Sequence, residues 1–206
     1  MTRQAKKKGL LFIISGPSGS GKTTLARKLV GSARFRDKLV RSVSLTTRPK
    51  RSGEKDKKDY FFISSEQFLR ELRAGQVLEW TRYLGYYYGT PKRFIDKQLD
   101  KARHMVLCLD LKGVRAIKRQ YKENTVTIFV MPPSLKSLLH RMTGRCSETK
   151  REEVRRRLKL AQRELSSVKQ YDYCVVNKDL KQATKRLREI VLTEISRFNY
   201  CGKEQE

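Results

Sequence analysis

The 206-residue sequence has no long apolar run. A helix that crosses a bilayer needs about 20 consecutive apolar residues, and no run approaches that length. The apolar stretch nearest the start, Leu10–Ile14, is also shorter than the core of a signal peptide, and glycines follow it in place of a small-residue cleavage site. We therefore predict no membrane span and a cytoplasmic location.

Metal-ligating residue types are scarce as well. The chain has two histidines, and its four cysteines, Cys108, Cys146, Cys174 and Cys201, are widely spaced without a CxxC pair. Structural zinc sites draw on closely spaced cysteines and histidines, so no zinc site is expected, and reduced thiols suit the cytoplasm. We expect Cys108 and Cys174, which lie near predicted strands, to be buried packing residues.

Acidic residues are outnumbered. The chain has 48 Lys and Arg residues and 21 Asp and Glu residues, which gives a net charge of +27. Such an excess attracts phosphates, nucleic acid and acidic surfaces, and it is compatible with non-specific polyanion binding. A basic surface without a specific partner explains the charge equally well. An RNA-binding signature with interleaved aromatic residues is absent from the sequence.

Short apolar runs alternate with helix-like segments, a pattern typical of a parallel α/β sheet. Strands are predicted at residues 10–14, 105–109, 125–130 and 174–176, and helices at 24–33, 113–121, 135–142, 152–169 and 180–198. The first of these strands is continuously apolar, as a strand with both faces covered must be.

Two segments interrupt this pattern, so we predict one domain (1–206) built from a core and two excursions. Residues 43–95 are rich in Tyr, Arg and Gly, and their strands look antiparallel and half-exposed, which suggests an inserted substrate-binding subdomain. Residues 137–165 are basic and mostly helical. The core then comprises 9–42, 96–136 and 166–200.

The strongest motif follows the first predicted strand and precedes a helix. It matches GxxxxGK[ST] and comprises Gly16, Pro17, Ser18, Gly19, Ser20, Gly21, Lys22 and Thr23, with Thr24 next. Glycines let successive N–H groups turn inward at phosphate oxygens, and the helix N-terminus adds positive charge. Lys22 would neutralise the β and γ oxygens of a nucleoside triphosphate, and the Thr23 hydroxyl would bind Mg²⁺.

Asp110 closes the predicted strand 105–109. Ligands gather at the carboxyl ends of strands in open α/β sheets, so a carboxylate there is expected near the magnesium, either directly or through a water molecule. A turn or helix-cap role is the alternative.

Phosphate donors are concentrated in the inserted segment. Arg48 and Arg51 offer planar forks for a phosphate dianion, and Tyr60 adds a hydroxyl. Farther on, Glu79 lies in apolar and aromatic surroundings, which favours a buried hydrogen-bonding role. A surface acid beside a packed Trp80 is the alternative.

These segments together resemble the guanylate kinase family. They read GPSGSGKTT, SLTTRPKRSGE, DYFF, LEW, GYYYGTP, DLKGV, PPS, RMTGR, RRRLKLAQREL and VVNKDL, in the family's order from Leu10 to about Ile190. The resemblance implies an α/β fold: a parallel β-sheet core with a phosphate loop and flanking helices, a small mixed β subdomain for GMP (43–95) and a helical lid (137–165). It also implies transfer of the γ-phosphoryl group of ATP to GMP with Mg²⁺.

The resemblance assigns roles position by position. The implied GMP contacts are Ser44, Arg48, Arg51, Tyr60, Glu79, Tyr88, Thr90 and Asp110. The implied catalytic cations are Lys22, Arg48, Arg141, Arg145 and Arg157. ATP would lie on the phosphate loop, with Asn177 at its adenine end. Guanine presents two donors on its N1/N2 edge, so a carboxylate is its natural acceptor, whereas AMP would leave Glu79 facing a lone pair.

The sequence departs from the family at two positions. Cys108 stands where an acidic residue is usual, two before Asp110, and Cys146 replaces a common glycine after Arg145. Neither change removes a residue assigned above, so activity is expected. The alternatives are a non-catalytic interaction module, which typically lacks an intact phosphate loop, and a ribose-bisphosphate kinase, which has little use for Glu79.

Overall fold

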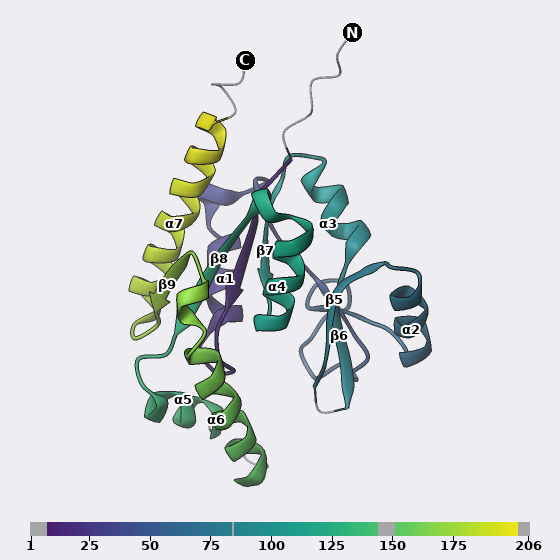
Figure 1. Cartoon of the computed structure of the whole chain (residues 1–206), viewed down its shortest axis with the longest axis vertical. Helices are drawn as coiled ribbons and strands as arrows, with labels where there is room; N and C mark the ends of the chain where they lie inside the picture. Colours follow the sequence, from purple (N-terminus) through teal and green to yellow (C-terminus); the bar gives the residue numbers. More distant parts are fainter. Residues whose placement is uncertain (1–7, 84, 144–150, 202–206) are drawn as a thin grey trace.

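The computed structural model describes residues 8–83, 85–143 and 151–201. Its centre is a five-stranded sheet with the spatial order β2-β7-β1-β8-β9 (Figure 1). The strands are β1 (Leu11–Ser15), β2 (Leu39–Arg41), β7 (His104–Cys108), β8 (Thr125–Met131) and β9 (Tyr173–Val176). All four pairings in this sheet are parallel, which confirms the predicted α/β core.

Strand β1 lies in the middle of the sheet, and all five of its residues are buried. The helices that pack on the sheet are α1 (Lys22–Val30), α3 (Lys92–Leu99), α4 (Leu111–Gln120) and α7 (Leu180–Cys201). Phe12 and Ile14 pack with residues of α1 and α7 on one face, and Leu11 and Ile13 pack with α3 and α4 on the other. Because successive side chains alternate across a strand, this apolar run serves two cores.

A second sheet has four strands in the order β4-β3-β6-β5. These are β3 (Ser44–Thr46), β4 (Tyr60–Phe62), β5 (Val77–Tyr83) and β6 (Tyr86–Pro91). The sheet is mixed, because β6 pairs antiparallel with both β3 and β5 whereas β3 and β4 are parallel. The expectation of antiparallel strands is therefore wrong for β3 and β4. A long segment, residues 47–59, joins them in place of a hairpin turn, and this length permits the parallel direction.

Helix α2 (Ser65–Arg73) also lies in this part of the chain, for which the residue pattern predicts strands. The Ser64 hydroxyl caps it by accepting the Gln67 amide at 3.1 Å. Phe68 is fully buried and packs with Leu45 and Val77 of the sheet. The helix thus covers one face of the second sheet and does not cover the opposite face.

Helices α5 (Leu135–Thr143) and α6 (Arg151–Leu165) follow β8 and contact each other through Leu138 and Ala161 (Figure 1). Helix α6 ends earlier than predicted, and three short 3₁₀ helices occur elsewhere, at Ala33–Phe35, Lys122–Asn124 and Val168–Gln170. In the described part of the chain, no helix is long and apolar enough to cross a membrane.

Candidate nucleotide-binding site

The phosphate loop, residues 16–23, joins β1 to α1 and has the backbone shape that its glycines permit. Gly16 and Gly21 have positive φ angles of 134° and 98°, which L side chains rarely adopt. A Cβ at Gly16 would collide with the Val130 carbonyl, and one at Gly21 with the Asn177 amide. These two glycines are therefore needed both for the turn and for the close approach of β8 and the residue after β9.

Lys22 begins α1 and folds back over the loop. Its Nζ donates to the carbonyl oxygens of Gly16 at 2.5 Å and Pro17 at 3.0 Å. Thr23 and Thr24 follow in the first turn with exposed side chains. The ammonium group thus lies at the mouth of the loop, and the N-terminus of α1 adds its dipole to the same place.

A cavity of about 550 Å³ lies beside this loop. The predicted site residues in its lining are Ser18, Lys22, Ser44, Tyr60, Glu79, Tyr88 and Asp110. Helix α6 adds Leu160, Arg163 and Glu164. The fold therefore brings together the phosphate loop, the second sheet and α6, three parts that are far apart in the sequence.

Glu79 lies on β5 and faces this cavity. Its Oε1 accepts a 2.5 Å hydrogen bond from the Thr90 hydroxyl on β6, and Thr90 is itself fully buried. Burial raises the pKa of Glu79 to about 7, the Thr90 bond opposes this shift, and the nearby Asp110 charge adds to it. Gly113 on α4 leaves room for the carboxylate, because a Cβ there would lie 2.9 Å from Oε2. The predicted hydrogen-bonding position of Glu79 thus agrees with the geometry, and the surface-acid alternative does not.

Asp110 lies in the cavity wall and also caps a helix. Its Oδ1 accepts the Gly113 amide at 2.8 Å, at the N-terminus of α4. The functional reading and the helix-cap alternative from the sequence are therefore compatible at this residue.

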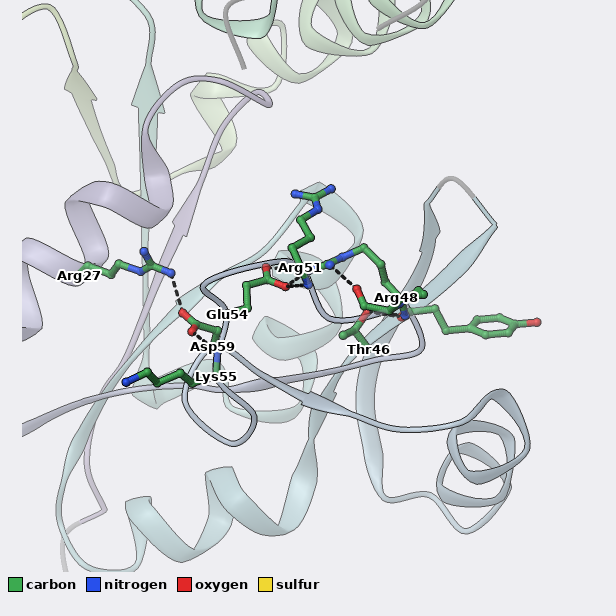
Figure 2. Close-up of polar contacts among 9 residues, drawn as sticks. Arg27, Thr46, Arg48, Arg51, Glu54, Lys55 and Asp59 are labelled. Carbon is green, nitrogen blue, oxygen red and sulfur yellow. Dashed lines mark hydrogen bonds and ion pairs between the residues drawn. The ribbon is translucent and has the colours of Figure 1, made fainter. Parts of the chain in front are cut away.

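Arg48 is held inside the second subdomain rather than extended into the cavity. It is 8% exposed, and its Nη2 donates to Oε1 and Oε2 of Glu54 at 2.8 and 2.9 Å (Figure 2). The guanidinium also lies over the rings of Tyr60 and Phe62, 5.5 and 5.8 Å from their centroids. Its Nη1 donates to the Pro49 carbonyl at 2.6 Å, so contact with a phosphate would use the donors that Glu54 and Pro49 leave free.

Arg51 lies in the same segment but is exposed. Its backbone amide donates to Glu54 Oε2 at 2.9 Å (Figure 2). Burial alone would favour the neutral form of Glu54, but the Arg51 amide and the Arg48 charge outweigh it and lower the pKa of Glu54. Glu54 thus stays ionised and orders both arginines.

Tyr60 on β4 and Tyr88 on β6 form an edge-to-face ring pair with centroids 6.0 Å apart. Burial raises the pKa of the Tyr60 hydroxyl, so this group remains protonated and can donate a hydrogen bond. Both tyrosines line the cavity on the side of the second sheet.

A second hollow of about 320 Å³ lies on the other side of the phosphate loop. It is lined by Gly19, Gly21, Thr24, Arg141, Asn177, Lys178 and Leu180. Asn177 is buried, donates from Nδ2 to the Ser20 carbonyl at 2.7 Å, and accepts Arg141 Nη2 on its own carbonyl at 3.1 Å. One residue after β9 therefore fixes both the phosphate loop and an arginine of α5.

The side chains of two predicted arginines lie outside the described part of the structure. Arg145 lies outside the described residues, and Arg157 lies in α6 but outside the residues whose side chains are described. Their proposed catalytic roles stay predictions.

Comparison with known proteins gives a consistent result. A family model described as guanylate kinase matches residues 8–194. The guanylate kinase of Caldanaerobacter subterraneus subsp. tengcongensis is 41% identical over 194 residues, which cover 94% of this chain and 92% of that protein. The guanylate kinase of Thermotoga maritima is 42% identical over 187 residues, covering 91% and 88%. This chain belongs to the guanylate kinase family.

The fold agrees with that assignment. The crystal structure of guanylate kinase from Anaplasma phagocytophilum superimposes with a TM-score of 0.74 at 34% identity, covering 92% of this chain and 87% of that one. The resemblance read from the motifs is thereby confirmed.

Cys108, the departure from the family's usual acid, lines the large cavity at the end of β7. Burial raises the pKa of its thiol to about 11, although Lys22, Arg41 and Arg27 oppose the shift. It is therefore a neutral thiol where relatives are expected to carry a negative charge. Cys174, by contrast, is exposed, so the expectation that it is buried was wrong. It lies on β9, an edge strand of the sheet, where alternate side chains face outward.

Sequence reasoning missed two acidic residues of this guanylate kinase family site. Glu54 lies three residues after Arg51 in the arginine motif, but the motif alone assigns it no role. Glu164 lines the cavity, and burial raises its pKa to about 7, with Lys22 opposing the shift and Asp110 adding to it. Its position seven residues after Arg157 on a predicted helix was the available signal, because residues two turns apart share a face.

Proposed function

We propose that this protein transfers the γ-phosphoryl group of ATP to GMP and so produces ADP and GDP. The observation that carries the proposal is that a phosphate-loop lysine, Lys22, and a half-buried acid suited to guanine, Glu79, line one cavity. Full-length relatives that bear the name guanylate kinase support the same activity.

The donor nucleotide is proposed to lie on the phosphate loop. Backbone amides of residues 16–21 and the Lys22 ammonium would hold its phosphates, and the hollow lined by Arg141 and Asn177 would receive its adenine end. The contact between Asn177 and the Ser20 carbonyl supports this arrangement, since it keeps the loop in shape before the nucleotide binds.

The acceptor is proposed to bind against the second sheet. Glu79 would accept the guanine N1–H and exocyclic amine, with Thr90, Ser44 and Asp110 completing the pocket. Arg48, Arg51 and the hydroxyls of two tyrosines, Tyr60 and Tyr88, would hold the GMP phosphate. An AMP molecule at this position would leave the carboxylate facing an acceptor, and unpaired buried groups give strong discrimination.

A magnesium ion fits the donor set of this site. Mg²⁺ prefers oxygen ligands and usually keeps several waters beside one or two carboxylates and the substrate phosphates. The Thr23 hydroxyl and Asp110, the latter through water, would hold it. When bound, it would neutralise charge on the transferring phosphoryl group. Among the described residues, no group of three or more His, Cys, Asp or Glu lies where it could hold a metal ion.

The chemistry requires alignment more than proton transfer. A GMP phosphate oxygen is already anionic near neutral pH, so no general base is needed. Lys22 and the arginines of residues 137–165, Arg141, Arg145 and Arg157, would surround a loose transition state whose charge lies on the equatorial oxygens. We infer that this lid and the subdomain 43–95 close over the core (9–42, 96–136 and 166–200), because water in an open site would compete with GMP.

One assay tests the proposal against its alternatives. The purified chain, given ATP and Mg²⁺, is offered GMP, AMP and a ribose bisphosphate, and ADP release is coupled to a spectroscopic readout. We expect turnover with GMP and at least about 100-fold lower kcat/KM with AMP. No turnover with any acceptor would indicate an interaction module, and turnover with the ribose compound alone would indicate the other kinase class. Cytoplasmic location and polyanion binding stay predictions from composition.

A further inference from the structure

The segment that carries the acceptor-phosphate arginines, residues 47–59, has little regular structure of its own. It joins β3 to β4 and leads directly into Tyr60. Inside it, the Asp59 carboxylate accepts the Lys55 amide on Oδ2 at 2.9 Å, and the Lys57 amide donates to the Tyr60 carbonyl at 2.8 Å. Its shape therefore depends on a few side-chain and turn contacts.

Two arginines of the core reach this segment from outside. Arg27 on α1 donates from Nη2 to Asp59 Oδ1 at 2.7 Å (Figure 2). Arg41 at the end of β2 donates to the Lys58 carbonyl. The Asp59 side chain is 16% exposed and that of Arg27 is 60% exposed, so the carboxylate is enclosed by the segment and the arginine approaches from the surface. The Lys55 amide, followed by the charges of Arg27 and Arg41, lowers the pKa of Asp59.

The ion pair links the two proposed phosphate sites by short covalent paths. On one side, Arg27 lies on the helix that begins at Lys22, and an α-helix is a stiff element with a rise of about 1.5 Å per residue. On the other side, Asp59 immediately precedes Tyr60. A change at this contact would therefore alter the distance between the donor and acceptor phosphates.

We propose that Arg27 and Arg41 are positioning residues, which seat the segment 47–59 against the helix of the phosphate loop so that acceptor and donor phosphates meet in line. The inference rests on the proposed phosphoryl transfer. Reacting atoms must approach to about 3–3.5 Å, and a misplacement of about 1 Å can reduce the rate by about 100-fold. Neither arginine is among the residues that line the cavity, and both contact the carboxylate or backbone of the segment.

A double-mutant cycle on Arg27 and Asp59 tests the proposal in the full chain. We expect R27A and D59N each to lower kcat/KM for GMP by about fivefold, the size of one well-formed, partly exposed ion pair. The double variant should be no worse than the poorer single variant, and R27K should recover most of the loss. The KM for ATP should stay within about twofold of the unchanged protein. K28A is the matched control, since Lys28 is the exposed neighbour on the same helix.

Hydrogen exchange at the amides of residues 55–60 provides a readout that needs no turnover. These amides should exchange faster in R27A and R41A than in K28A, because the segment loses its contacts with the core. Equal exchange in all three variants, or additive losses in the double variant, would overturn the inference. Absence of GDP formation by the unchanged protein would instead refute the proposed function, while the exchange result would still report on the contact.

Discussion

The Thr90 hydroxyl donates a 2.5 Å hydrogen bond to Oε1 of Glu79 across the β5–β6 pair. This bond fixes one oxygen of the carboxylate, and Oε2 lies near Gly113 of α4. A half-buried acid is thus oriented in advance, which is the arrangement that selective recognition of two neighbouring N–H donors requires.

Replacing Glu79 by glutamine should reduce discrimination for guanine. The amide can still accept the Thr90 hydroxyl, but it brings an NH₂ group against the donors of the guanine edge. We expect kcat/KM for GMP to fall by about 100-fold in E79Q and that for AMP to fall much less. E66Q, at an exposed position on α2, is the control. Equal losses with both nucleotides would contradict a role in base recognition.

The same carboxyl should make folding stability depend on pH. Its pKa is raised from an ordinary 4.5 to about 7, so the folded protein favours the protonated form. The stability that this group contributes is complete below about pH 4.5 and is lost as the pH rises through about 7. The free energy of unfolding of the unchanged protein should therefore decrease relative to E79Q, by up to about 3 kcal/mol, between these values.

Urea unfolding at pH 5 and pH 8 measures that difference. Glu164 lines the same cavity and is present in both proteins, so its own titration largely cancels in the comparison. If the free energy of unfolding changes with pH in the same way in E79Q and the unchanged protein, burial does not raise the pKa of Glu79.

Arg48 and Arg51, which lie in the segment 47–59, should differ in their contributions to stability. R48A would leave Glu54 without its charged partner in a largely buried position, so the free energy of unfolding should fall by about 2 kcal/mol. Arg51 is exposed, and R51A should change stability by less than about 0.5 kcal/mol.

In the kinase assay, by contrast, R48A and R51A should resemble each other. Each should raise the KM for GMP by about tenfold or more, because a charge-assisted contact with phosphate is lost. The KM for ATP should remain within about twofold of its normal value. A similar rise in both KM values would count against the assignment of these arginines to the acceptor.

The sequence predicted the regular parts of this molecule better than its short ones. Leu10–Ile14 was recognised as a central strand because a strand covered on both faces is continuously apolar, and the structure places β1 at Leu11–Ser15. The edge strand β2, Leu39–Arg41, was not predicted, because three residues that include an arginine are too few to show a periodic pattern of apolar residues. Helix α2 was missed because its segment was interpreted as half-exposed strands, although Ser64 and Phe68 carried a helix signal.

Individual site residues could be predicted only where they belong to a motif whose residue types indicate the chemistry. Lys22 and Glu79 came from such motifs, and the fold brings them to one cavity. Contacts such as Arg27 with Asp59 could not be inferred, since they join residues of different elements and depend on how the second subdomain packs against the core. Charge alone gave no guidance, because basic residues are abundant throughout the chain.

Asn177 should matter for ATP more than for GMP. In N177D, a carboxylate oxygen would face the Ser20 carbonyl in place of the Nδ2 donor. Repulsion between two buried acceptors should loosen the phosphate loop and raise the KM for ATP by about tenfold. N124D is a suitable control, because the Asn124 amide also donates to a backbone carbonyl, that of Gly9, at a distance from the loop. An unchanged KM for ATP in N177D would exclude this role.

Ala102 offers a test of backbone strain away from the site. It lies in the turn between α3 and β7 with a φ of +54°, where a Cβ costs about 1 kcal/mol relative to glycine. A102G should therefore raise the free energy of unfolding by about 0.5–1 kcal/mol, measured by urea titration, because relief of this strain exceeds the entropy that glycine adds to the unfolded chain. A74G provides the opposite case, since Ala74 is the C-cap residue that follows α2, with a φ of −77°, and its replacement should lower stability by a similar amount. If both variants shift stability in the same direction, the positive φ of Ala102 does not determine the outcome, and the strain attributed to that turn is relieved by its neighbours.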